Sequence, residues 1–376
     1  MNPQVWIATR KGLFQLQRGA KAGSWKIARS AFLGDPVHIV LPVVQKGKLT
    51  AVFAALGHEH FGTKIHRSTD GGKSWEQVGV PAYPKPKKGE KIVHDPIRNR
   101  PIEWVMRGVW ALETGHPSNP QRLWCGTLPG GLFRSDDFGK TWKLTRSLWD
   151  RPERAFMFGG GKDWPGIHSI CIHPTDPKKL AVAFSGGGVW RSDDDGKSWR
   201  CDSTGIRNEY MPPGKAYDPV SQDPHRMVQC PVEPNTFWIQ HHNGIFHSVD
   251  GADSFREVKE ARPSVFGFAV AVHPKDPKTA WFVPGVKDEK RFPVDAKVVV
   301  SRTRDGGKSF DILRQGLPQE QAYDVVYRHA LDVDGSGEKL CFGSTTGNLW
   351  ASENGGERWQ TISTSLPPIY AVRFVK

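Results

Sequence analysis

Short apolar runs alternate with polar turns along this chain of 376 residues. In the clearest segment, residues 167–174 (IHSICIHP) alternate in polarity, and residues 180–185 (LAVAFS) and 188–192 (GVWRS) are two further apolar runs. The turns TDPKK and GGG separate these runs, and residues 197–202 (KSWRCD) follow them. Runs of about 4 to 8 residues between Gly- and Pro-rich turns indicate strands joined by hairpins. The segment therefore predicts four antiparallel strands.

One octapeptide recurs in the turn between the third and fourth of these strands. Its pattern is Ser/Thr-x-Asp-x-Gly-x-x-Trp, and it occurs at residues 68–75, 135–142, 192–199, 248–255, 303–310 and 352–359. The Asp-like positions are separated by 67, 57, 56, 55 and 49 residues. A period of about 50 to 60 residues is typical of a fold built from one repeated supersecondary unit. Four antiparallel strands per repeat predict the blade of a β-propeller.

The octapeptide has the chemistry of a turn that satisfies itself. Its Ser and Asp side chains can accept hydrogen bonds from the loop's own amides, and its glycine can adopt a positive φ. The Trp can fill the apolar layer between neighbouring sheets. The repeats tolerate Ala at 252, Phe at 255 and 310, and Asn at 354, changes that a metal site or a catalytic carboxylate would not survive. We therefore expect a structural turn rather than a repeated ligand site.

A seventh unit is split between the ends of the chain. Residues 4–31 supply second, third and fourth strands with no octapeptide, and residues 369–375 (IYAVRFV) supply the missing first strand. Joining both ends in one blade closes the ring and leaves no exposed sheet edge. The sequence thus predicts an all-β fold, a seven-bladed β-propeller with four antiparallel strands per blade. We expect residues 1–376 to form one domain.

Composition adds few constraints on function. The five cysteines are widely spaced, with no CxxC pair, which is typical of reduced core thiols. No apolar run approaches the roughly 20 residues of a membrane helix, and the start lacks a signal-peptide pattern, so we expect a cytoplasmic protein without a membrane partner. The net charge is +13, but the one dense basic cluster, residues 85–91, contains no aromatic residue. This pattern argues against a nucleic-acid partner.

The octapeptide resembles the Asp-box, or BNR repeat, of the sialidase-like propeller superfamily. The stretch TRKGLF near the start, together with the HPxDP turns, is similar to uncharacterised bacterial BNR-repeat proteins often labelled sialidase-like or glycosyl hydrolase. The resemblance covers essentially the whole chain. It implies the fold and leaves the chemistry open, because Asp-boxes also occur in sortilin-like receptors, xyloglucan-cleaving enzymes and photosystem assembly factors.

The resemblance also implies which face carries the active site, namely the face opposite the Asp-boxes. That face receives the loops between second and third strands and the crossings between blades. Three crossings, residues 79–106, 147–166 and 203–225, are unusually long, and long loops on a rigid scaffold often carry function. The HPxxP-type turns lie on the other face, so we expect the histidines that begin them to be structural: His116, His173 and His273.

Two glycosidase chemistries can be compared with these loops. The sialidase mechanism implies an arginine clamp, a Tyr–Glu pair and an Asp acid, but the family's Arg-Ile-Pro motif is absent and Arg10 lies in TRKG instead. Residues of the right types are present without a matching spacing: Arg154, Arg226, Tyr217 and Tyr323. Another glycosidase would need two carboxylates about 5 to 10 Å apart. The candidates for that pair are Glu59, Asp163, Asp218 and Asp223.

Histidines on the same face predict a third chemistry, a site for a divalent transition metal such as zinc, manganese or iron. The predicted ligands are His58, His60, His168, and His241 or His242. Glu59, Tyr217 or His225 would then act as acid or base. Seven-bladed lyases that act on acidic sugars are similar in holding a metal with channel histidines, although no lyase motif occurs here.

A non-catalytic scaffold that recognises a protein or a glycan is the alternative. Trp164 and the neighbouring aromatic residues could stack on a sugar or a peptide, and arginines could hold a carboxylate. Our leading interpretation is a propeller that binds, and in the enzyme reading cleaves, a polar carbohydrate-like or acidic small ligand. The predicted catalytic residues are Glu59, Asp218, Tyr217, His225 and Arg154, and the predicted ligand-binding residues are Arg10, Trp164, Arg226 and Tyr323.

Overall fold

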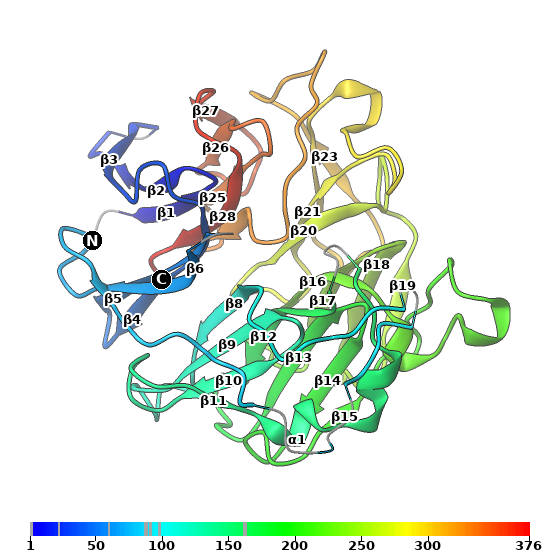
Figure 1. Cartoon of the computed structure of the whole chain (residues 1–376). Helices are drawn as coiled ribbons and strands as arrows, with labels where there is room; N and C mark the ends of the chain where they lie inside the picture. Colours follow the sequence, from blue (N-terminus) through cyan, green and yellow to red (C-terminus); the bar gives the residue numbers. More distant parts are fainter. Residues whose placement is uncertain are drawn as a thin grey trace.

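The computed structural model contains seven four-stranded antiparallel sheets arranged as the blades of a propeller (Figure 1). It describes residues 3–21, 23–58, 61–85, 89, 92–96, 99–160 and 164–376. The inner strand of each blade contacts the inner strands of the adjacent blades, and β28 contacts both β4 and β24, so the ring is closed. The predicted all-β, seven-bladed fold is confirmed.

The blades follow one another in chain order after the first, which combines both ends of the chain. Blade I contains β28 (Ile369–Phe374), β1 (Gln4–Thr9), β2 (Gly12–Arg18) and β3 (Trp25–Ala31). Blade II contains β4 (Val37–Gln45), β5 (Lys48–His58), β6 (Gly62–Ser68) and β7 (Glu76–Gln77). Blade III contains β8 (Gly108–Thr114), β9 (Leu123–Leu128), β10 (Leu132–Ser135) and β11 (Lys143–Leu144). Blade IV contains β12 (Gly166–Ile172), β13 (Leu180–Ser185), β14 (Gly188–Ser192) and β15 (Arg200–Cys201).

The last three blades repeat this plan. Blade V contains β16 (Pro224–Gln229), β17 (Phe237–His241), β18 (Gly244–Ser248) and β19 (Arg256–Val258). Blade VI contains β20 (Gly267–Val272), β21 (Ala280–Pro284), β22 (Val300–Thr303) and β23 (Asp311–Leu313). Blade VII contains β24 (Leu331–Val333), β25 (Leu340–Gly343), β26 (Leu349–Ser352) and β27 (Trp359–Ser363). Short helices occur only in loops in the described part of the chain: α1 (Arg146–Trp149), η1 (Pro152–Phe156), η2 (Pro213–Lys215), η3 (Pro219–Ser221) and η4 (Val294–Ala296).

The two ends of the chain meet in blade I, as the sequence predicts. Strand β28 pairs antiparallel with β1, with Val5 opposite Phe374 and Ile7 opposite Val372. In Figure 1 the ends of the chain lie on the same side of the molecule. This pairing covers the inner edge of β1, which would otherwise present unpaired amides and carbonyls.

The Asp-boxes are self-satisfied turns between third and fourth strands. In the fourth blade the Ser192 hydroxyl accepts the Gly196 amide at 2.8 Å and donates to Asp194 Oδ1 at 2.8 Å. The Asp194 carboxylate accepts the amide and the hydroxyl of Ser198. Gly196 has φ +80°, and Ala252, which replaces the glycine in blade V, also has a positive φ of 68°. The structural role predicted for the octapeptide is therefore confirmed.

The fourth strands are shorter than the sequence predicts. Residues 197–202 were expected to form a strand, but β15 contains only residues 200–201. Residues 192–199 remain in the Asp-box turn, and the outermost strand has only one neighbour, β14, with which to exchange hydrogen bonds. The strand therefore ends where the chain leaves its single partner.

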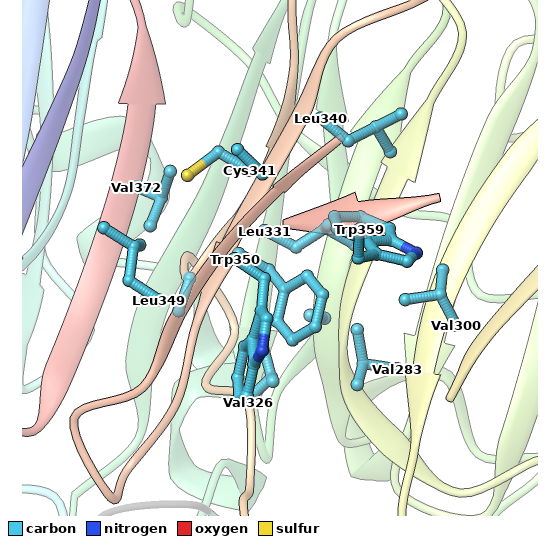
Figure 2. Close-up of a cluster of buried hydrophobic side chains, with 14 of the residues drawn as sticks. Val283, Val300, Val326, Leu331, Leu340, Cys341, Leu349, Trp350, Trp359 and Val372 are labelled. Atoms are coloured by element: carbon cyan, nitrogen blue, oxygen red, sulfur yellow. The ribbon is translucent and has the colours of Figure 1, made fainter. Parts of the chain in front are cut away.

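Apolar side chains from adjacent blades form the core between the sheets. Between blades VI, VII and I, Val283 and Val300 face Trp350 and Trp359, and Val372 of β28 completes the cluster (Figure 2). Trp359 is the Asp-box tryptophan of blade VII, so the box places its ring in the layer between blades as predicted. This packing fixes the seven blades as a rigid support for the loops. No helix in the described residues has the length and apolarity needed to span a membrane.

Alternating strand direction assigns each loop to one of two faces. The Asp-boxes and the first-to-second-strand turns share one face, where His116, His173 and His273 bond their own or an adjacent turn. Loops between second and third strands, together with the crossings between blades, share the other face, here called the funnel face. The first residues of every inner strand also open onto this face.

Candidate functional site

Seven inner strands begin around the mouth of the central channel on the funnel face. The residues at or just before the start of these strands are aromatic residues, histidines and an arginine: His38, Trp110, His168, His225, Phe268, Arg328 and Tyr370. Below this ring, His329 Nε2 donates to the His168 carbonyl at 2.7 Å, and Arg226 donates to the same carbonyl at 3.1 Å. These bonds tie blades IV, V and VII together across the channel. The accessible chemistry therefore lies above them, at the mouth.

Asp223 is the buried carboxylate of this mouth. It ends the crossing into β16, and its Oδ1 accepts the Ser185 hydroxyl at 2.8 Å and the Gly186 amide at 3.0 Å. Oδ2 lies 3.6 Å from His242 Nδ1. Burial alone would raise the pKa of Asp223, but the bond to His242 and the charge of Arg328 contribute to outweighing burial and lower that pKa. The carboxylate is therefore ionised at neutral pH.

Two histidines lie beside Asp223. His225 in β16 is buried, its Nδ1 bonds the Gly267 carbonyl at 2.7 Å, and its ring stacks on Phe268. His242 lies in the β17–β18 turn, with Nδ1 near Asp223 and Nε2 3.9 Å from Asp288 Oδ2. Burial lowers the pKa of His225, whereas the two carboxylates offset burial at His242 and raise its pKa. One donor atom each from Asp223, His225 and His242 lie within 4.8 Å of one another.

Arg328 brings to the same mouth a positive charge that has no carboxylate within salt-bridge distance among the described residues. It is 7% exposed, and its Nε and Nη2 have no hydrogen-bond partner among the described residues. Its guanidinium lies 4.9 Å from the Trp110 ring centre and 5.5 Å from that of Phe268. Burial lowers the pKa of Arg328 to about 10. A buried donor without an acceptor is rare in folded proteins and marks a position where a ligand acceptor would fit.

A small hollow adjoins this charge between blades VI and VII. The volume open to a water-sized probe is about 10 Å³, and the lining includes Phe266, Phe268, Arg291 and the carboxylate of Asp324. Arg291, in the β21–β22 loop, pairs with Asp288 and lies 5.5 Å from the Phe268 ring centre. A cavity needs about 10 to 15 Å³ of such volume to hold one water molecule. The hollow therefore has room for about one water and does not by itself enclose a sugar unit.

Aromatic side chains form an exposed rim around the mouth. Among the described residues, the exposed phenylalanine and tyrosine side chains all lie in funnel-face loops: Phe61, Phe156, Tyr210, Tyr217, Tyr323 and Tyr327. Their exposure ranges from 37% for Tyr327 to 76% for Phe61. Exposed aromatic residues confined to one face indicate a recognition surface rather than random surface composition.

The predicted metal ligands do not converge as a set. His58 Nε2 lies 3.4 Å from Asp35, in blade II, and is absent from the Asp223 group. His168 donates Nε2 to the Pro224 carbonyl, and Nδ1 bonds Ser169. His241 uses its Nε2 lone pair to accept the Asp223 amide. His60 and Glu59 lie outside the described residues, as does Asp163. Of the five predicted histidines, we retain only His242 in the candidate site.

The other predicted residues are spread over the funnel face. Asp218 is an exposed N-cap of η3, Tyr217 beside it is 64% exposed, and Tyr323 contacts Phe292. Arg10 is exposed beyond β1, Arg154 lies over the Trp149 ring, and Arg226 bonds the carbonyl of His168. The Trp164 ring stacks under Arg100 and Arg107. Of the predicted catalytic residues, His225 lies at the channel mouth beside Asp223.

The sequence analysis missed Arg328, Asp288 and Arg291, which belong to blades VI and VII. A pattern that could have found Arg328 was present. His168 lies at the start of the first strand of blade IV, and YRHALDV at residues 327–333 occupies the equivalent position in blade VII. Asp288 and Arg291 lie in the β21–β22 loop, whose length was overlooked because its charges resemble those of an ordinary solvated loop.

Comparisons with known proteins agree with this architecture. The family model described as BNR-Asp box repeat matches residues 132–145, which contain the second octapeptide. A sialidase from Bacteroides fragilis is 28% identical over 163 residues, covering 38% of this chain and 29% of that protein. The octapeptide's resemblance to Asp-box repeats is thus confirmed.

Solved structures show the same fold at low sequence identity. The GH74 xyloglucanase from Xanthomonas campestris has a TM-score of 0.64 and 17% identity, covering 97% of this chain and 53% of that one. YCF48 bound to D1 peptide has a TM-score of 0.50 and 12% identity, covering 86% of this chain and 84% of that one. The chain therefore spans about half of the xyloglucanase, and its match to the sialidase spans under a third of that enzyme.

Proposed function

We propose that the funnel mouth binds an acidic carbohydrate, with the ligand's carboxylate on Arg328 and its sugar ring against Phe268. The observation that carries this proposal is the buried guanidinium of Arg328, whose Nε and Nη2 lack a partner in the described part of the chain. Arginine pairs with carboxylates through parallel N–H donors, and burial strengthens such charge-assisted bonds. The likeness to sialidase and GH74 propellers supports a carbohydrate-related role.

The charge balance of the mouth favours an anion over a neutral ligand. Asp288 is paired with Arg291, and Asp223 is paired with His242. Arg328 then remains without a carboxylate within salt-bridge distance in the described residues. An anion bound at the mouth beside Arg328 would neutralise this charge, whereas a neutral sugar would leave it buried and unpaired. Charge-assisted bonds contribute about 1.5 to 3 kcal/mol, so the acid should bind at least about tenfold more tightly.

Titration calorimetry with matched sugars tests this proposal. Galacturonate and glucuronate should bind, and galactose and glucose should bind at least tenfold more weakly. Arg328→Met should remove that preference, while Arg10→Met, an exposed arginine beyond the mouth, should keep it. Equal affinity for acid and neutral sugar, or an unchanged preference in Arg328→Met, would overturn the proposal.

The second candidate is a scaffold that recognises a longer chain without cleaving it. The exposed aromatic rim favours this reading, because it extends well beyond the hollow and could stack on successive sugar or peptide units. Incubation with an acidic oligosaccharide separates the two readings. New reducing ends would support cleavage, whereas tight binding with the oligosaccharide recovered intact would support recognition alone.

A further inference from the structure

We propose that Asp223, His225 and His242 bind one divalent transition-metal ion at the channel mouth. These residues come from the blade IV–V crossing, the inner strand of blade V and its β17–β18 turn. One donor atom from each lies within 4.8 Å of the others. The proposal does not depend on the carbohydrate ligand, since it concerns three side chains whose positions are set by the blade.

His225 has the protonation pattern of a metal ligand. A carbonyl oxygen can only accept, so the bond from Nδ1 to the Gly267 carbonyl places the ring proton on Nδ1. The lone pair then lies on Nε2, which makes no hydrogen bond within the described residues. Metal-binding histidines characteristically donate the other ring nitrogen to a carbonyl or carboxylate in this way.

His242 shows the corresponding arrangement with a carboxylate. Its Nδ1 faces Asp223 at 3.6 Å, and its Nε2 faces Asp288 at 3.9 Å. If Nδ1 binds the metal that Asp223 also binds, Nε2–H points toward Asp288, as in a carboxylate–histidine–metal group. The His242 side chain is 21% exposed and lies in a turn, so it can move toward the other donors.

Asp223 is positioned to supply the third donor. Its Oδ1 is held by Ser185 and the Gly186 amide, which leaves Oδ2 facing His242. Metal–ligand bonds of about 2.0 to 2.2 Å separate ligands in a tetrahedral site by about 3.4 Å. The donors lie within 4.8 Å of one another, so a contraction of at most roughly 1.4 Å would reach this spacing.

The donor set defines the metal class. Two imidazoles and one carboxylate suit zinc, iron(II), cobalt or manganese rather than calcium or magnesium, which prefer oxygen ligands. Three protein ligands leave coordination positions open for a ligand or water. His168 and His241 cannot join them, because their Nε2 atoms are engaged with the Pro224 carbonyl and the Asp223 amide.

The competing arrangement is a protonated His242 that bridges Asp223 and Asp288 without a metal. The two arrangements differ in a measurable way, because a metal must displace the proton from His242. A divalent ion would also add positive charge beside Arg328 and Arg291. Its affinity should therefore rise when an anionic ligand enters the mouth, and this one expectation rests on the proposed function.

The test uses tag-free protein stripped with a chelator and dialysed. Cobalt(II) alone is titrated while visible absorption is recorded, and zinc is titrated by calorimetry. We expect one equivalent to bind, with a cobalt spectrum of low coordination number and proton release on binding. His242→Gln, and His225→Asn, which keeps a donor near the position of Nδ1, should each weaken binding at least tenfold. His58→Gln is the matched control on the same face and should bind as the wild type does.

Three outcomes would overturn the metal site. The first is that the folded wild-type protein fails to bind one equivalent of metal at 1 mM metal. The second is that His242→Gln and His225→Asn both bind metal as tightly as the wild type. The third is that His58→Gln loses metal binding. Thermal melts show whether each variant is folded, and Asp223→Asn is omitted because Asp223 is buried and anchors Gly186. Because no sugar is present, failure here leaves the carbohydrate proposal standing, and failure of sugar binding leaves the metal result intact.

Discussion

Replacing Arg328 by methionine should stabilise the protein while removing its preference for acids. Arg328 is 7% exposed, and its Nε and Nη2 are unpartnered among the described residues, so its charge is buried at a net cost although Asp223 and Asp288 offset part of it. Methionine retains most of the aliphatic length that packs near Trp110 and Phe268, and it has no polar group to desolvate. The substitution therefore separates the energy of folding from that of binding.

The magnitude follows from the pKa of Arg328, which burial lowers from 12.5 to about 10. Each pKa unit corresponds to about 1.4 kcal/mol, so carrying the charge at neutral pH costs roughly 3 kcal/mol. The folded protein binds this proton more weakly than the unfolded chain does. The Arg328 charge therefore destabilises the folded state at every pH at which the guanidinium is protonated in both states, including neutral pH. Unfolding entropy of about 2.1 cal/mol/K per residue gives about 0.8 kcal/mol/K for 376 residues, so the melting temperature should rise by about 4 °C.

Arg226→Met is the matched control. Burial lowers the pKa of Arg226 to about 10 as well, but Arg226 donates to the His168 carbonyl and lies 3.4 Å from the Ser169 hydroxyl. Its removal deletes a charge-assisted hydrogen bond to the carbonyl that joins blades IV, V and VII, so this variant should melt lower than the wild type. Melting is followed by circular dichroism at pH 7. A lower melting temperature for Arg328→Met, or shifts of the same sign in both variants, would refute the claim that burying the Arg328 charge has a net cost.

Four further predictions follow from the turns, the mouth and the ring. Ser192→Ala strips the Asp-box glycine amide of its acceptor and should lower the free energy of unfolding by about 1 to 3 kcal/mol, measured by urea titration. The Ser198 hydroxyl lowers the pKa of Asp194 to about 2, so the stability that Asp194 supplies persists above pH 4 and is lost toward pH 2. The difference in melting temperature between wild type and Asp194→Asn should therefore shrink between pH 4 and pH 2. A difference that stays constant over this range would contradict the prediction. Gly160→Ala places a Cβ 2.6 Å from Asp223 Oδ1 and should weaken cobalt binding at least tenfold while the fold persists by circular dichroism. Deleting residues 369–376 exposes β1 and should produce oligomers in light scattering, whereas a monomer that melts normally would argue against ring closure by β28.

The repeat alone was enough to predict the propeller. Six octapeptides at a near-constant period, each after an apolar run, fixed the position of the turn within the blade and the number of strands around it. The ring closure was also predictable, because residues 4–31 lacked a first strand and residues 369–375 lacked partners. Both inferences depend on local chemistry, since hydrogen bonds within a turn and period-two alternation are encoded by neighbouring residues.

The resemblance to Asp-box propellers implied a face for the candidate site, but the site could not be assembled from the sequence. Asp223, His225 and His242 were all noticed in funnel-face segments, yet so were His58 and His168, which have the same local appearance. Which nitrogen carries a free lone pair depends on partners 18 to 56 residues away, such as Asp223 for His241 and Pro224 for His168.

The environment of Arg328 could not be predicted from the sequence either. Its sequence neighbourhood is that of an ordinary strand entry, and its lack of partners appears only when Trp110 and Phe268 from two other blades surround it. The sequence by itself determined the blade and the number of repeats, because these arise from periodic local patterns. Only the tertiary structure decided which charges are paired at the mouth, because seven inner strands from distant parts of the chain converge there.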